Sequence, residues 1–204
     1  IQVVSRLKKH GYSLKVDQVL RNPILADLAK KIAFNTRNID QSPVKGTVEL
    51  TPIQHYFFKD NQIVVHSYFN QSVLLKSEKM VDYNILRKAL ADLVNHHDAL
   101  RMIYKKEGSV WSQLNKGTSS SNFSIDFHDL SNEEEEREKM KYLGEETQAS
   151  INLEKGPLFK VLHFRLSDGD RVALIIHHLV IDGVSWRILL EDLSVLYLKY
   201  KNNS

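Results

Sequence analysis

Two adjacent histidines, His177 and His178, are the residues of this chain best suited to chemistry. They end an apolar run that begins at Val172, and Asp182-Gly183 follows shortly after them. Imidazole has a reference pKa of about 6.5, so it can take up and return a proton near neutral pH. Polar titratable groups at the end of a buried strand are costly unless they are hydrogen-bonded or used in a reaction. A pair of satisfied core histidines and a catalytic base are both open interpretations of this pattern.

The histidine pair is poorly placed to bind a metal ion. Adjacent residues of a strand point to opposite faces, so the two imidazoles cannot easily reach one ion. The chain has no Cys, and no His-x-x-x-His spacing occurs near the pair. The sequence therefore predicts no metal site here.

The segments that must position the pair predict an α/β (α+β) fold. The β-branched run 172–176 indicates a strand buried on both faces, and Asp168-Gly169-Asp170 predicts a hairpin turn before it. Apolar stripes at helical spacing predict helices that cover a mixed or antiparallel sheet. The expected helices are 82–100, 132–149 and 185–200, and the expected strands are 65–75, 111–114, 123–127 and 159–166.

The first 37 residues differ from the rest in charge. They hold eight Lys and Arg against two Asp, a balance of +6, whereas the remaining chain has a balance of −3. They also read as a small helical piece that begins mid-helix, and the polar stretch 38–48 that follows reads as a linker. A basic segment can bind nucleic acid, but this one lacks interleaved aromatics and a reading motif. We therefore predict no nucleic-acid partner.

Composition is that of an ordinary globular protein. Hydrophobic residues make up 42% and charged residues 26% of the chain. The absence of Cys fits a reducing compartment, and no apolar run approaches the roughly 18 residues of a membrane span. These features predict a cytoplasmic protein without a membrane partner.

The full pattern around the histidines resembles a core motif of the condensation and epimerization domains of nonribosomal peptide synthetases, relatives of chloramphenicol acetyltransferase. The motif is His177-His178-Leu-Val-Ile-Asp182-Gly183-Val-Ser-Trp186. Thr51-Pro-Ile-Gln-His-Tyr-Phe-Phe58 resembles the first signature of the epimerization branch, and 95–102 resembles a second signature shared by both branches. The residues of these motifs favour epimerization over condensation.

The resemblance also implies a division of the chain. Residues 1–37 resemble the C-terminal part of a peptidyl carrier domain, and 49–204 resemble the N-terminal half of an epimerization or condensation domain with a chloramphenicol acetyltransferase-like fold. The cofactor implied is 4'-phosphopantetheine, covalently held by a carrier serine that would lie upstream of Ile1. In the family a second acid/base, a Glu, belongs to a later motif. We therefore expect the 204-residue chain alone to be inactive and not to be loaded by a phosphopantetheinyl transferase.

The resemblance assigns a role to each motif residue. His178 is the expected general acid/base, acting on the α-carbon of an aminoacyl or peptidyl thioester, and His177 is a structural neighbour. Asp182 is expected to form an ion pair with Arg101, and Gly183 to let the backbone turn closely beside the base. Trp186 belongs to the same signature and supports it.

The expected partners are the carrier-tethered substrate and the neighbouring adenylation, carrier and condensation domains. A condensation domain, which joins two carrier-bound substrates, is the alternative function, and a non-catalytic docking half-domain is another. Tyr56 and Phe57 are expected to be core residues. His96 and His97 are expected to be structural or solvated.

Overall fold

In the computed structural model, the described residues are 2–34, 42, 44–59 and 65–202. The chain divides into two compact units, residues 1–42 and 43–204. The first unit holds the helices α1 (Gln2–Lys9), α2 (Val16–Arg21) and α3 (Leu25–Ala29) and the short strands β1 (Tyr12–Ser13) and β2 (Ala33–Phe34). Strands β1 and β2 pair antiparallel. Among the described residues of this unit, Leu14 and Leu28 are the buried apolar side chains.

The second unit is built on a four-stranded mixed sheet. Its strands are β4 (Asn70–Ser77), β7 (Ser124–Asp129), β8 (Phe159–Leu166) and β9 (Gly169–His177), in the order β4-β9-β8-β7. Strands β7 and β8 run parallel, and the other neighbours are antiparallel. Because β9 lies inside the sheet and is buried along most of its length, the expectation of a strand buried on both faces is confirmed.

The turn between β8 and β9 depends on a glycine. Gly169 has a φ of +110°, and a Cβ at this position would lie 2.4 Å from the backbone oxygen of Ser77. Only glycine adopts such a φ readily and leaves room for the neighbouring backbone. The expected hairpin at 168–170 is therefore confirmed, with Gly169 as its first paired residue.

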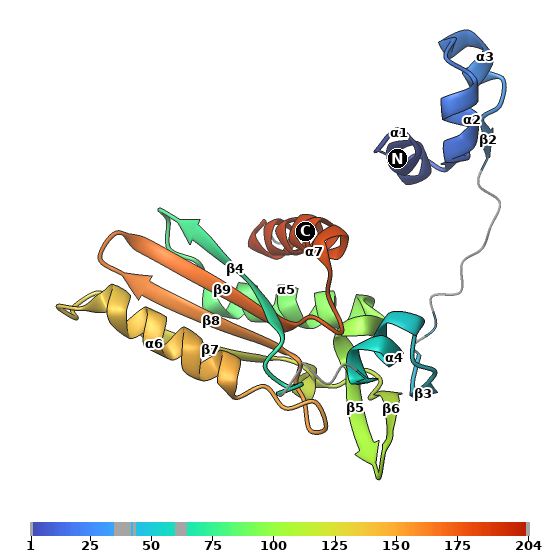
Figure 1. The fold of residues 1–204 in the computed structure, drawn as a ribbon. Helices are drawn as coiled ribbons and strands as arrows, with labels where there is room; N and C mark the ends of the chain where they lie inside the picture. The colour runs from blue at the N-terminus through green and yellow to red at the C-terminus, as the bar shows by residue number, and fades with distance from the viewer. Residues whose placement is uncertain (1, 35–41, 43, 60–64, 203–204) are drawn as a thin grey trace. The chain divides into compact units, whose positions relative to one another are not determined.

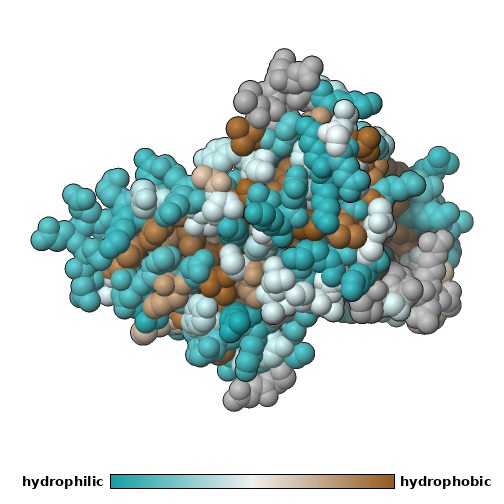
Figure 2. Space-filling model, turned by 90° about the horizontal axis from the view of Figure 1, so that it is seen from below, coloured by the Kyte–Doolittle hydropathy of each residue, from teal (hydrophilic) through white to brown (hydrophobic). Residues whose placement is uncertain are grey.

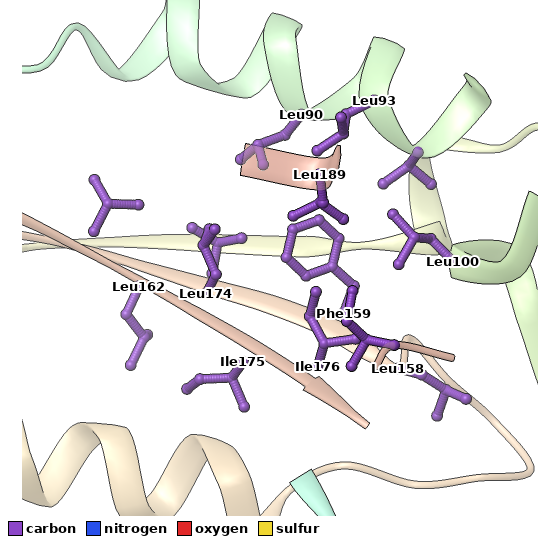
Figure 3. Close-up of a cluster of buried hydrophobic side chains, with 14 of the residues drawn as sticks. Leu90, Leu93, Leu100, Leu158, Phe159, Leu162, Leu174, Ile175, Ile176 and Leu189 are labelled. Atoms are coloured by element: carbon purple, nitrogen blue, oxygen red, sulfur yellow. The ribbon is translucent and has the colours of Figure 1, made fainter. Parts of the chain in front are cut away.

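Three helices cover this sheet. Helices α5 (Tyr83–His96) and α7 (Gly183–Lys201) pack against one face, and α6 (Glu136–Ala149) lies on the other (Figure 1). The apolar stripes of α5 and α7 meet the sheet over Phe159, Leu174 and Ile176 (Figure 3). In the same view Leu162 and Ile175 point to the opposite side, toward α6, as the twofold alternation of a strand requires. The core thus has one layer on each side of β8 and β9.

Polar contacts between α5 and α7 fix the two helices to each other. The hydroxyl of Tyr200 bonds to the carboxylate of Asp92, and the ring of His97 lies 2.9 Å from the carboxylate of Asp192. The backbone N–H of Asp82, just before α5, donates to the hydroxyl of Tyr197 at 3.0 Å. These contacts hold α7, and therefore the loop that leads into it, in one place.

A second, three-stranded sheet lies beside the histidine end of the main sheet (Figure 1). It contains β3 (Gly46–Val48), β6 (Val110–Asn115) and β5 (Met102–Glu107), all antiparallel. Residues 46–48, expected in the linker, are therefore part of a sheet, because their backbone pairs with β6. The short helix α4 (Pro52–Lys59) follows β3, and the expected linker residues 38–41 and 43 lie outside the described residues.

Most expected elements are present with shifted ends. Helix α5 ends at His96 rather than at 100, because residues Asp98–Arg101 form a separate 3-10 turn. Helix α6 begins at Glu136 and β4 at Asn70, each later than expected.

Seen from below Figure 1, hydrophilic side chains cover most of the surface, and hydrophobic ones gather across its middle (Figure 2). In the described part of the chain, no helix combines the length and apolar character needed to cross a bilayer.

Candidate active site

His177, the last residue of β9, is completely buried and fully hydrogen-bonded. Its Nε2 lies 2.7 Å from the carbonyl oxygen of His66, and its Nδ1 accepts from the backbone N–H of Leu179 at 3.2 Å. The carbonyl oxygen only accepts, so Nε2 carries the proton and the ring is neutral. Burial lowers the pKa of His177 to about 4. These contacts are those of a histidine that shapes the loop.

His178 follows at the edge of the cavity described below and is only half-buried. Its backbone N–H donates to the carbonyl oxygen of Phe69 at 2.8 Å, and the Phe69 ring stacks on the imidazole with centroids 5.3 Å apart. Nδ1 of His178 lies 2.8 Å from the carbonyl oxygen of Ile181, and Nε2 lies 3.0 Å from Nε2 of Gln71. The ring is therefore held from three directions beside an accessible space.

Asp182 ends the loop by capping α7. Its carboxylate accepts from the backbone N–H of Ser185 at 2.7 Å and from the hydroxyl of Ser185 at 2.6 Å. These hydrogen bonds lower the pKa of Asp182, so it is ionised near neutral pH. Asp182 thus satisfies the first turn of α7, the usual task of an N-cap aspartate.

The expected ion pair between Arg101 and Asp182 was wrong. The Arg101 guanidinium is buried and donates to the carbonyl oxygens of Val94 and Asn95, at 3.0 and 2.7 Å, and to the carboxylate of Asp98. Free carbonyls at the end of a helix attract a cation, and Arg101 supplies it for α5 from the turn that follows. Asp98, three residues away, satisfies its charge locally.

The expectation that Gly183 lets the backbone turn closely beside the base was also wrong. It is the first residue of α7, its φ is not positive, and an added Cβ would meet no atom within 4 Å. The backbone geometry alone does not require glycine at this position. The loop turns closely beside His178 because Ile181 and Phe69 bind its ring and backbone.

A cavity of about 620 Å³ opens between α4 and the loop 178–182. A volume of this size is typical of small-molecule sites. His178 and Asp182 line it together with mostly apolar side chains; the others are Thr51, Ile53, Gln54, Tyr56, Phe57, Phe69, Ala99, Leu179, Val180, Ile181 and Ser185. The structure thus brings His178, Asp182 and the 51–58 signature to one place.

Helix α4 is tied to the loop by a polar contact that the sequence did not reveal. Gln54 donates to the hydroxyl of Tyr104 at 2.9 Å, and that hydroxyl donates to the carbonyl oxygen of Leu179 at 3.2 Å. Burial raises the pKa of Tyr104, so its hydroxyl keeps its proton. Phe57 is buried as expected, but Tyr56 is 67% exposed and lines the cavity, which corrects its expected core role.

Trp186 reaches the site through Gln71, which sequence reasoning also missed. The indole Nε1 donates to Oε1 of Gln71 at 2.7 Å, and Gln71 in turn meets His178. A lone Gln in a strand of mixed character gives no signal by itself. Gln71 comes close to His178 only because β4 pairs with β9 in the folded chain.

One group among the described residues, His96, His97 and Asp192, has possible ligand atoms within 4.8 Å of one another. The 2.9 Å separation of His97 and Asp192 is a hydrogen-bond distance between α5 and α7. It agrees with the structural role expected for His97, while His96 is exposed.

Comparison with known proteins places this geometry in context. The family profile described as "Condensation domain" matches residues 44–204. The chain is 45% identical over 199 residues to a component of plipastatin synthase from Bacillus subtilis and 41% identical over 197 residues to tyrocidine synthase 2 of Brevibacillus parabrevis. Both matches cover 97% of this chain but only 8% and 6% of these long relatives.

Solved structures give the same fold. The crystal structure of the epimerization domain from the third module of tyrocidine synthetase B matches with a TM-score of 0.78 and 41% identity, over 81% of this chain and 38% of that one. The starter condensation domain of a rhizomide synthetase matches with a TM-score of 0.66 at 16% identity, over 78% of this chain and 38% of that one. The second likeness is one of fold alone.

Proposed function

The chain belongs to the condensation-domain family of nonribosomal peptide synthetases, and we propose that it is part of an epimerization domain within that family. The substrate proposed is an aminoacyl or peptidyl thioester on the phosphopantetheine arm of a carrier domain. The reaction inverts its α-carbon from L to D. Domains of this family act on carrier-tethered substrates together with neighbouring synthetase domains.

In the proposed reaction His178 is the base. Its Nε2 removes the α-hydrogen as a proton, and the electron pair of the C–H bond passes to the thioester carbonyl, which gives an enolate. A proton returned to the opposite face of the α-carbon completes the inversion without an oxidant or reductant. The second acid that the family resemblance implies would deliver this proton. A positioned base contributes about 10²–10⁴-fold to such a step.

The surroundings of His178 suit this role. Its stacking on Phe69 and its bond to Ile181 fix the ring beside a cavity with mostly apolar walls. His177 stays neutral, so it places no second positive charge beside the base. Asp182 is satisfied by Ser185 and has the role of shaping the loop.

The observation that carries the proposal is the likeness to the tyrocidine epimerization domain, at 41% identity over most of the chain. Two condensation domains of known structure, from the rhizomide and CDA synthetases, are only 16% and 19% identical to this chain. The signatures at 51–58 and 182–186 favour the same branch. Condensation is the second candidate, because the family profile bears that description and the same histidine pair serves both branches.

We propose further that residues 1–37 are the end of the carrier domain that presents the substrate. They belong to a compact unit of their own, and the residues resembling a carrier domain all fall within it. The phosphopantetheine arm would then belong to this carrier. Adenylation, carrier and condensation domains of the same synthetase are the proposed neighbours.

Chirality of the carrier-bound residue tests the proposed reaction. A carrier-bound L-aminoacyl thioester is incubated, without an acceptor, with a synthetase that contains this chain, and the amino acid is hydrolysed and analysed on a chiral column. Epimerization gives a mixture of L and D residues. His128 of β7, which does not line the cavity, provides a matched control, and His128→Ala is expected to keep the activity. An unchanged L residue, together with dipeptide once a second loaded carrier is added, would favour condensation instead.

A further inference from the structure

Gln71 of β4 stands between Trp186 and His178 and hydrogen-bonds to both. Its Oε1 accepts from the indole Nε1 of Trp186 at 2.7 Å, and its Nε2 lies 3.0 Å from Nε2 of His178. The sheet register pairs Gln71 with Ile176, two residues before His178, so its backbone is fixed by β9. All three side chains are half-buried.

The direction of each hydrogen bond in this chain follows from groups that can act in one way only. An indole N–H can only donate, so the atom of Gln71 that faces Trp186 must be the oxygen. The amide NH₂ of Gln71 is therefore turned toward His178. At the other side of the ring, the carbonyl oxygen of Ile181 can only accept, so Nδ1 of His178 must carry a proton.

These two constraints define one tautomer of His178. With its proton on Nδ1, the neutral ring presents a lone pair on Nε2, and this lone pair accepts from the amide of Gln71. A proton on Nε2 would place two donors against each other at 3.0 Å. In this tautomer the basic nitrogen of the ring is Nε2.

We propose that Gln71, oriented by Trp186, is a positioning residue that fixes the Nδ1–H tautomer of His178 and so assigns Nε2 as the nitrogen that exchanges protons with substrate. The functional part of this statement rests on the proposed role of His178 as the base. The tautomer itself does not depend on which reaction the site performs. In the resting site Gln71 occupies the lone pair, and the α-hydrogen of the substrate replaces it when the reaction begins.

The tautomer can be read directly by NMR on the 204-residue chain labelled with ¹⁵N. Long-range ¹H–¹⁵N correlations distinguish a protonated from a bare ring nitrogen, and the His178 signals are assigned by their loss in His178→Gln. The proposal expects Nδ1 to be protonated and Nε2 to be bare in the wild-type chain. The opposite assignment in the wild type overturns it without any further variant.

Two substitutions test the part played by Gln71 and Trp186. Gln71→Glu keeps the shape of the side chain but turns an acceptor toward Nε2, so Nε2 is expected to gain a proton. Trp186→Phe removes the donor that orients the amide, so the amide can turn its oxygen toward Nε2, and a measurable fraction of rings is expected to carry a proton on Nε2 in addition to the one on Nδ1. Gln148→Glu, which adds the same charge on helix α6, serves as the matched control and should leave the ring unchanged.

The outcomes separate positioning from packing. If Gln71 only fills space, Nδ1 stays protonated and Nε2 stays bare in Gln71→Glu and Trp186→Phe, and the proposal is wrong. Should Gln71→Glu not fold, the wild-type assignment and Trp186→Phe still decide the question. Failure here leaves the chirality assay untouched, and failure of that assay leaves the tautomer measurement untouched, so the two ideas can be rejected separately.

Discussion

Acidification should unfold this protein partly through one residue, His177. Burial holds its pKa at about 4 in the folded chain, whereas an unfolded chain has the ordinary value of about 6.5. The unfolded state therefore binds more protons between these two values, and the free energy of unfolding falls as the pH falls through this window. The stability that the protein loses in this window through His177 is fully present above about pH 6.5. At about pH 5 the two pKa values give a loss of about 2 kcal/mol from this single group.

The substitution that isolates this loss is His177→Gln. Its amide nitrogen can replace the Nε2 donor to the carbonyl of His66, but it does not titrate. The variant loses the acceptor for the N–H of Leu179, which lowers its stability by about 1–3 kcal/mol at every pH. The gap between wild type and variant should therefore narrow by about 2 kcal/mol between about pH 7.5 and about pH 5.

Urea unfolding at the two pH values measures this gap. Ile176→Val, a core change one residue away, is the control, since it should cost about 1 kcal/mol equally at both pH values. Other groups titrate alike in the wild type and in both variants, so they cancel. A gap for His177→Gln that stays constant within about 0.5 kcal/mol would refute the reasoning, because extrapolated unfolding energies resolve a difference of about 2 kcal/mol.

Three further predictions concern stability, and each is checked by urea unfolding. Arg101→Ala should lower the free energy of unfolding by about 3 kcal/mol or more, because buried carbonyls and Asp98 lose their donor. Asp182→Ala should lower it by about 1 kcal/mol, and the two effects should add in the double variant. A coupling energy above about 1 kcal/mol would indicate that Arg101 and Asp182 form an ion pair after all. Leu90→Ala should cost about 2–5 kcal/mol, since the side chain is completely buried between α5 and the sheet, and a cost below about 1 kcal/mol would contradict that packing. Gly183→Ala should leave stability unchanged or raise it slightly, whereas Gly169→Ala should cost more than about 1 kcal/mol; equal effects would contradict the account of these turns.

The fold was largely readable from the sequence, because its signals are local. Apolar periodicity located α5 and α7, and the β-branched run before His177 located the central strand. Element ends were less accurate where a short-range contact competes with the periodic pattern. At the end of α5, for example, Arg101 folds back onto the last carbonyls of the helix, and this divides the expected helix 82–100 into two pieces.

The site was readable only in part, because its contacts join segments far apart in the chain. The histidine motif marks the loop, but nothing in the sequence pairs Gln71 with Trp186, 115 residues away, or Gln54 with Tyr104. The Arg101–Asp182 pair, which the family resemblance implied, does not form, because each residue finds a partner three residues along its own segment. Register and tertiary packing supply this information.

Deuterium exchange at the α-carbon tests the central claim, that His178 is the base, most directly. A synthetase that contains this chain is given a carrier-bound L-aminoacyl thioester in D₂O, and mass spectrometry follows incorporation of deuterium at the α-carbon. The account expects exchange in the wild type and in the His128→Ala control, and a loss of about 10²–10⁴-fold in His178→Ala. Exchange at the wild-type rate in folded His178→Ala would contradict it and remove His178 as the base.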